Sequence, residues 1–201
     1  MTPAKRILDL VLAGLALVLL APLGLWICGL ILWRDGRPVL FRSERMRGPE
    51  DAFTLLKFRT MRPDPADFGV TGADKEDRVT RTGRWLRKYR LDELPQLWNI
   101  LRGDISFVGP RPPLRVYVDA APGLYARVLR SRPGLTGLAT LHYFKHEARI
   151  LSRCTTGAET HTTYLRRCVP AKARLDLIYQ RNRSVCYDVI LLWQTVRSVL
   201  R

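Results

Sequence analysis

The longest apolar stretch of the chain lies close to its N-terminus. Leu10 to Trp33 contain no charged residue, and basic residues flank both ends, among them Lys5, Arg6 and Arg34. The stretch is long enough to span a bilayer as one helix. Pro22 divides it into arms of about 12 residues, or ~18 Å of helix each, and basic flanks are typical of cytoplasmic ends. A bent helix that enters one leaflet and returns fits these features, and a single tilted span with a proline kink is the equal alternative.

Two extended patterns follow the apolar stretch. Residues 38–46 and 52–60 are separated by a segment of turn composition at 48–51, so a small β-hairpin is expected. Alternation along the second strand places Lys57 and Arg59 on the same face. This arrangement would present two cations to an anionic group, although two ordinary surface cations are the simpler interpretation.

Mostly helical patterns make up the rest of the chain. One begins at Thr82 and leads to the adjacent carboxylates of Asp92 and Glu93. A second helix is expected from Pro95 to Gly103, because proline suits a first helical turn and glycine a helix C-terminus. Residues 61–80, which are rich in Pro, Asp and Gly, read as an exposed loop.

Two further helical regions have an apolar face whose partner the sequence does not identify. Leu114–Arg130 is divided by Pro122-Gly123 into two short helices that could lie at a membrane surface. The C-terminal stripe fits either a core helix or a membrane-surface helix, and its apolar residues are Val185, Val189, Leu192, Trp193, Val196, Val199 and Leu200. We therefore expect a mostly α-helical α+β fold, with residues 1–33 as the membrane segment and 34–201 as the catalytic body.

The charge of the chain narrows the class of partner. Its 201 residues carry a formal net charge of +16, while 47% of them are hydrophobic. This combination fits a protein at an anionic lipid surface, or one that handles phosphates. Nucleic acid is the less favoured partner, because the sequence includes no recognisable nucleic-acid-binding module. The four cysteines lack CxxC spacing and are expected to be free thiols.

The candidate chemistry is concentrated between Leu91 and Pro113. Asp92 and Glu93 are adjacent and follow a basic run that includes Arg87 and Arg90. This positive charge is expected to keep both carboxylates ionised. A sheltered, ionised carboxylate can act as a nucleophile or bind a metal, whereas a solvated acidic pair is the simpler interpretation on spacing alone.

Two arginines in turn-forming segments are candidates for binding anions. Prolines on both sides of Arg111 stiffen its backbone, which suits bidentate recognition of a phosphate or nucleotide. Arg132 begins a turn-forming loop whose backbone amides could contact an anion. By contrast, His142, His146 and Glu147 lack the spacing of a zinc site, so a packed or solvated role is expected.

Six motifs follow one another over nearly the whole chain. They are Lys57-Phe58-Arg59-Thr60-Met61, Asp92-Glu93-Leu94-Pro95-Gln96-Leu97-Trp98-Asn99, Arg102-Gly103-Asp104, Ser106-Phe107-Val108-Gly109, Pro110-Arg111-Pro112 and Arg132-Pro133-Gly134-Leu135-Thr136-Gly137. In order and approximate spacing they resemble the motifs of the bacterial sugar transferases known as monotopic phosphoglycosyl transferases. The segment Lys145-His146-Glu147-Ala148 departs somewhat from the family's pattern, so what that segment selects stays open.

The resemblance implies an enzyme that transfers a sugar 1-phosphate from a UDP-sugar to polyprenyl (undecaprenyl) phosphate and releases UMP. This would be the first membrane step in making a surface glycan or exopolysaccharide. The resemblance also implies a re-entrant helix in a monotopic protein at the cytoplasmic face of the bacterial inner membrane.

In that scheme Asp92 attacks the phosphate that bears the sugar and forms a covalent intermediate, while Glu93 holds Mg²⁺. The side chains expected to bind substrate phosphates are Lys57, Arg59, Arg90, Arg111 and Arg132. A non-catalytic basic membrane anchor that recruits glycan-assembly partners is the rival interpretation. The sequence names neither the sugar nor the pathway, and it leaves open whether the protein is a homodimer.

Overall fold

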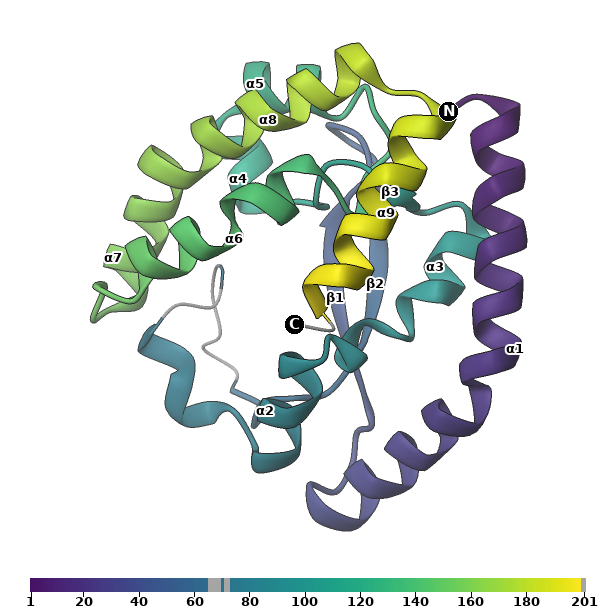
Figure 1. Cartoon of the computed structure of the whole chain (residues 1–201). Helices are drawn as coiled ribbons and strands as arrows, with labels where there is room; N and C mark the ends of the chain where they lie inside the picture. The colour runs from purple at the N-terminus through teal and green to yellow at the C-terminus, as the bar shows by residue number, and fades with distance from the viewer. Residues whose placement is uncertain (65–69, 71–72, 200–201) are drawn as a thin grey trace.

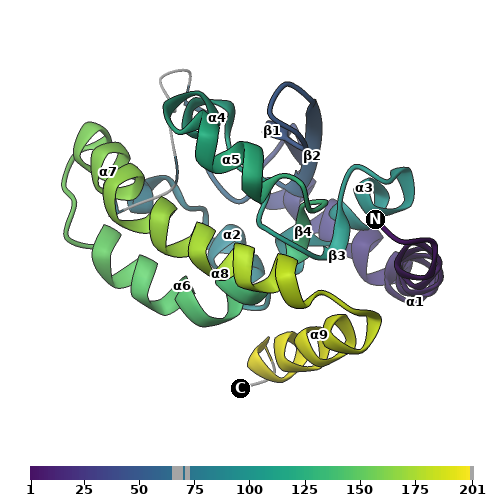
Figure 2. The same ribbon diagram turned by 90° about the horizontal axis from the view of Figure 1, so that it is seen from above.

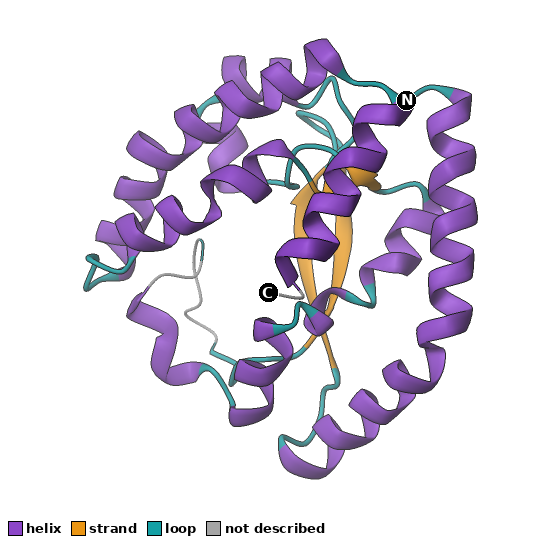
Figure 3. Ribbon diagram, viewed as in Figure 1, coloured by secondary structure: helices purple, strands orange, loops and turns teal. Residues whose placement is uncertain are grey.

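The computed structural model describes residues 1–64, 70 and 73–199 of the chain (Figure 1). Helices dominate, and short strands lie among them (Figure 3). The α-helices are α1 Pro3–Arg34, α2 Arg81–Lys88, α3 Gln96–Arg102, α4 Arg115–Ala120, α5 Pro122–Val128, α6 Leu138–Leu151, α7 Gly157–Thr163, α8 Val169–Asn182 and α9 Val185–Val199. The strands are β1 Leu40–Met46, β2 Ala52–Phe58, β3 Ser106–Val108 and β4 Gly134–Thr136. Short 3₁₀ segments are η1 Ala73–Arg78 and η2 Leu91–Glu93, and η3 Tyr164–Cys168 is a π-helix. The mostly helical α+β fold is confirmed.

α1 is one continuous helix of 32 residues, and Figure 1 shows that it bends along its length. Pro22 lies inside it, where a proline removes a backbone hydrogen bond and kinks a helix. The expected bend is present in a single continuous helix, ~48 Å long by its residue count, whereas its re-entry into one leaflet stays a prediction. Its first turn begins after Thr2, whose side chain accepts a hydrogen bond from the Lys5 amide.

Both ends of α1 pack against the rest of the chain. Near the N-terminal end Ala13 is buried in a cluster with residues of α3. Towards the C-terminal end Ile27 and Ile31 are buried in a cluster that includes Phe58 of β2. Between these contacts, residues 17–22 are all exposed, so this apolar part of the helix has solvent-accessible side chains on every face.

The predicted β-hairpin is confirmed. β1 and β2 pair antiparallel, with Leu40 opposite Phe58 at one end of the ladder. The second strand ends at Phe58, two residues earlier than expected. Arg59 therefore lies just beyond the ladder, where the alternation of side chains no longer fixes its direction.

A second, parallel sheet joins β3 to β4, so the loop expected after Arg132 contains a strand. Glycine allows the backbones around this sheet to touch: a Cβ at Gly134 would lie 2.1 Å from the backbone nitrogen of Gly109. No other residue could be accommodated there without moving one backbone. This close contact fixes the segment that leads from β3 to Arg111.

α4 and α5 are separated at Pro122 as predicted. Their buried side chains are those of Tyr117, Val118, Tyr125 and Val128, which belong to the largest apolar cluster of the described residues. α6 and α8 run beside one another (Figures 1 and 2) and contribute to the same cluster. The apolar faces of α4 and α5 therefore pack in the core. Contact between these helices and a membrane stays a prediction, and it could involve only their outward-facing side chains.

Most of the apolar stripe of α9 does not face the core, although Leu192, one of its members, packs against a core cluster. Leu191 is buried against Val108 and Tyr179, but Leu191 was not part of the predicted stripe. Two members of that stripe, Val189 and Trp193, are 49% and 67% exposed, and Leu200 lies outside the described residues. α9 thus uses one face for the core and displays the other.

Candidate active site

Asp92 and Glu93 lie in their own helical turn between two α-helices. α2 ends at Lys88, before the pair, rather than at the pair as expected. Arg90 then takes a left-handed backbone conformation with a φ of 54°, which redirects the chain into η2. Pro95 precedes α3, and α3 ends at Gly103 with a φ of 83°, as the sequence predicts. This helix, turn and helix arrangement buries both carboxylates.

Glu93 is held by two cations from other parts of the chain. Its Oε1 accepts hydrogen bonds from Lys57 Nζ at 3.0 Å and from Arg111 Nη2 at 2.9 Å. Glu93 is 9% exposed. Burial alone would raise the pKa of Glu93, but the charges of Lys57 and Arg111 outweigh it and hold the pKa well below its usual range. Glu93 is therefore the buried, ionised centre of a three-residue network with Lys57 and Arg111.

Asp92 has weaker contacts. Its Oδ2 lies 3.9 Å from Lys57 Nζ, and the residue is 8% exposed. Burial is the largest influence and raises the pKa of Asp92, and the negative charge of Glu93 raises it further, against the opposing charge of Lys57. The basic surroundings thus dominate at Glu93 but not at Asp92. The two adjacent carboxylates differ in environment, as two groups with different roles require.

The remaining expected cations are distributed over three places. Arg90 stays near the pair: its charge lowers the pKa of Glu93, and its guanidinium lies 5.4 Å from the centre of the Phe144 ring. Arg59 is directed elsewhere, because it donates hydrogen bonds to the backbone carbonyls of residues 35–37 after the end of α1. The structure therefore brings Lys57, Arg90 and Arg111 to the carboxylates and turns Arg59 towards the end of α1.

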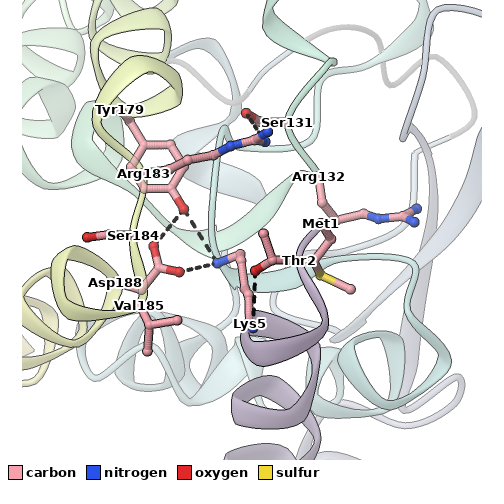
Figure 4. Close-up of a pocket in the computed structure, with 10 residues that line it drawn as sticks. All are labelled: Met1, Thr2, Lys5, Ser131, Arg132, Tyr179, Arg183, Ser184, Val185 and Asp188. Carbon is pink, nitrogen blue, oxygen red and sulfur yellow. Dashed lines mark hydrogen bonds and ion pairs between the residues drawn. The ribbon is translucent and has the colours of Figure 1, made fainter.

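Arg132 lines a separate small cavity of about 90 Å³ near the start of α1. Figure 4 shows it with Lys5 and with Arg183 and Asp188 from the region where α8 leads into α9. Among the contacts of the described residues, none joins Arg132 to Asp92 or Glu93. Binding of substrate phosphate by Arg132 therefore stays a prediction. The position of Arg132 beside the start of α1 does not favour it.

Asn99 is a residue of the site region whose role the sequence did not reveal. It is 1% exposed and its Oδ1 accepts a hydrogen bond from the Leu56 amide at 3.0 Å. Its Nδ2 donates to the Thr54 carbonyl at 2.8 Å and to Asp104 Oδ2 at 3.0 Å. Asn99 thereby holds α3 against β2, the strand that carries Lys57. The only available signal was its place in the carboxylate motif.

Two further arginines near the pair were also missed as site residues. Arg87 lies close enough for its charge to lower the pKa of Asp92. Arg45 of β1 donates to the Pro112 carbonyl at 3.4 Å, and burial, followed by the charge of Arg111, lowers the pKa of Arg45 to about 10. A single arginine in a strand carries no sequence signal for such a position.

The carboxylate oxygens of the pair suit a Mg²⁺ ion, which proteins commonly bind through one or two carboxylates together with substrate phosphates. The two ion pairs of Glu93 both use Oε1, so Oε2 and the Asp92 carboxylate are the oxygens that could hold the metal. Glu147, which lies near His142 and His146 in the sequence, instead pairs with Lys172 at 2.7 Å. The described residues include no cluster of three or more His, Cys, Asp or Glu side chains that could hold a metal by themselves.

The sequence profile of bacterial sugar transferases matches residues 1–201. The chain belongs to the bacterial sugar transferase family. This confirms the resemblance drawn from the motifs, and it places the buried carboxylates, Lys57 and Arg111 within the region that the family shares.

Three family members illustrate the relatives of this chain. It is 40% identical over 202 residues to a UDP-glucose:undecaprenyl-phosphate glucose-1-phosphate transferase of Caulobacter vibrioides, with 98% of this chain and 69% of the relative covered. It is 35% identical over 216 residues to the exopolysaccharide production protein ExoY of Sinorhizobium fredii, with 98% and 85% covered.

The third relative is the UDP-N-acetylgalactosamine-undecaprenyl-phosphate N-acetylgalactosaminephosphotransferase of Aeromonas hydrophila. It is 33% identical over 203 residues, which are 98% of this chain and 43% of the relative. The chain thus spans less than half of that relative and most of the other two.

Proposed function

We propose that this family member transfers a sugar 1-phosphate from a UDP-sugar to undecaprenyl phosphate and releases UMP, at the start of exopolysaccharide or surface glycan assembly. The names of its relatives support the donor and acceptor classes. The observation that carries the proposal is the buried pair of unequal carboxylates, of which Glu93 is bound by Lys57 and Arg111. A buried anionic centre beside several cations suits a reaction in which negative charge moves between phosphates.

In the proposed reaction an Asp92 carboxylate oxygen attacks the phosphorus that bears the sugar. The bond from that phosphorus to the bridging oxygen breaks, and UMP leaves with the bonding electrons. An oxygen of undecaprenyl phosphate then attacks the same phosphorus, so its bond to Asp92 breaks and the carboxylate is restored. The weaker pairing of Asp92, at 3.9 Å from Lys57, leaves its oxygens freer to attack than those of Glu93.

The cations would bind the donor diphosphate. Lys57 and Arg111 reach Glu93 from β2 and from the proline-framed loop, and Arg90 approaches from the same turn. Glu93 would hold Mg²⁺, which when bound neutralises charge on the diphosphate and helps UMP to leave. Glu93 would also keep Lys57 and Arg111 in place before the donor arrives.

The contacts at the two ends of α1 support a monotopic arrangement, and the basic residues at both ends support the cytoplasmic face of the inner membrane. Arg6, near the start of the helix, donates to the carbonyls of Ile100 and Leu101 at 2.6 and 2.7 Å. Arg59 binds the carbonyls that follow its end. A spanning helix would place its ends on opposite sides of the bilayer, whereas here one body binds both. The exposed apolar residues 17–22 would then enter one leaflet, close to the lipid-bound acceptor.

The test is a covalent intermediate on Asp92. Protein in nanodiscs is incubated with Mg²⁺ and each of several UDP-sugars without lipid acceptor, and its peptides are analysed by mass spectrometry. We expect a phosphosugar mass on the peptide that contains Asp92, its loss in Asp92→Asn, and its retention in the exposed control Asp119→Asn. Turnover with acceptor should follow ping-pong kinetics.

Other outcomes would contradict the proposal. An adduct on another residue would remove Asp92 as the nucleophile. UMP release that requires both substrates to be bound would argue against the covalent step. No UMP from any common UDP-sugar, with intact membrane-bound protein and acceptor present, would favour the non-catalytic basic anchor.

A further inference from the structure

Three polar residues in the first turns of α1 bind the catalytic body directly. Lys5 Nζ pairs with Asp188 Oδ2 at 2.6 Å (Figure 4). It also donates a hydrogen bond to the Val108 carbonyl at 3.0 Å. Arg6 donates to two carbonyls at the end of α3. Asp9 Oδ1 accepts a hydrogen bond from the Phe107 amide at 3.2 Å. Most other residues of α1 are apolar, but the side chains of these three residues contact the rest of the protein.

Asp9 is the most unusual of the three. It is 1% exposed, and its second oxygen, Oδ2, is buried without a hydrogen-bond partner among the described residues. Burying a carboxylate that is only partly hydrogen-bonded costs free energy. The hydrogen bond that Asp9 does make comes from the Phe107 amide. β4 does not use this amide, because Ser106 pairs with Gly134 and Val108 pairs with Thr136. Asp9 therefore holds the otherwise unpaired edge of β3.

The segments held by α1 lead directly to the proposed site. β3 continues through Gly109 and Pro110 to Arg111, whose guanidinium binds Glu93 at 2.9 Å. α3, held by Arg6, begins just after the Asp92-Glu93 turn. The start of the membrane helix thus contacts the chain on both sides of the catalytic network.

We infer that Asp9 is a positioning residue for Arg111, and that it couples the membrane helix to the alignment of the carboxylate pair. The inference rests on the proposed function, because alignment matters only if the pair reacts. Asp9 acts through the backbone of β3 and does not touch substrate. Its loss should loosen the Arg111 segment and leave the membrane anchor intact.

The test compares two substitutions that keep the branching of the Asp9 side chain, made in the whole chain in nanodiscs. Asp9→Leu removes the acceptor and leaves the Phe107 amide without its side-chain partner. Asp9→Asn keeps an oxygen acceptor. Asp119→Leu, at an exposed acid on α4, is the control for charge. UMP release gives kcat and KM for the UDP-sugar, and hydrogen exchange reports the Phe107 amide.

We expect Asp9→Leu to lower kcat by about 10- to 100-fold, the scale of a small misplacement of reacting groups, with a smaller change in KM. Exchange at Phe107 should rise, Asp9→Asn should recover most of both losses, and all variants should stay membrane-bound. A folded Asp9→Leu protein with wild-type kcat would overturn the inference, as would faster Phe107 exchange without loss of kcat or an Asp9→Asn variant as impaired as Asp9→Leu. A wild-type protein that releases no UMP would instead count against the proposed function.

Discussion

Alanine substitution of Arg59 and of Arg111 should separate the stability of the protein from its catalytic activity. Both were expected to bind phosphate. Arg111 contacts Glu93, whereas Arg59 is 7% exposed and donates to the carbonyls of residues 35–37. Replacing each by alanine should therefore damage different properties of the protein.

The size of the Arg59→Ala effect follows from its three hydrogen bonds. A hydrogen bond to a charged group contributes about 1.5–3 kcal/mol, and bonds within one network do not add fully. We expect Arg59→Ala to lower the free energy of unfolding by about 3 kcal/mol, which for a domain of this size lowers Tm by about 6–12 °C. KM for the UDP-sugar should change little at temperatures where the variant is folded.

Arg111→Ala should show the opposite pattern. The Arg111 side chain is 36% exposed, and Lys57 still pairs with Glu93 in its absence, so the free energy of unfolding should fall by about 1.5 kcal/mol, the low end for a charged hydrogen bond, and by less than in Arg59→Ala. Loss of one preorganised cation should lower kcat/KM by about 100-fold or more.

Thermal unfolding in detergent and UMP release in nanodiscs measure the two properties on the same preparations. An Arg59→Ala variant with wild-type Tm and a raised KM would refute the assignment of Arg59 to the end of α1. A large loss of Tm in Arg111→Ala would show that Arg111 serves the fold as much as the site.

Three further predictions test other parts of the structure. Gly134→Ala should destabilise the protein by more than about 3 kcal/mol, since its Cβ would lie 2.1 Å from a facing backbone nitrogen, whereas Gly123→Ala, with nothing within 4 Å, should be tolerated in thermal unfolding. Burial raises the pKa of Asp176 from 3.8 to about 7, against the charge of Lys172. Between these two pH values the folded state binds a proton that the unfolded state has lost, so Tm should fall as pH rises from about 4 to about 7. Asp176→Asn should flatten this dependence of Tm on pH. If Tm of the wild type does not vary there, Asp176 titrates normally. Cysteines introduced by Pro3→Cys and Arg34→Cys should both resist labelling from outside intact cells, and labelling of one alone would indicate a spanning helix.

Local features of the sequence were sufficient for much of the fold. The hairpin of β1 and β2, the end of α3 at Gly103 and the break before α5 at Pro122 were all predicted. Each depends on side-chain alternation or on the backbone limits of glycine and proline, which act within a few residues. The carboxylate pair was likewise recognisable, because its motif is contiguous.

Tertiary contacts decided what those elements face. Alternation placed Lys57 and Arg59 together, but β2 ends between them, so one side chain reaches Glu93 and the other reaches the end of α1. The stripe on α9 was visible in the sequence, yet packing against Tyr179 buries Leu191 instead. The pKa of Asp92 rises because burial outweighs the opposing charges of Lys57, Arg111 and Arg87, of which only Arg87 belongs to the basic run before it. Periodicity determines which residues share a face, whereas the partner, burial and charge opposite that face come from segments distant in the chain.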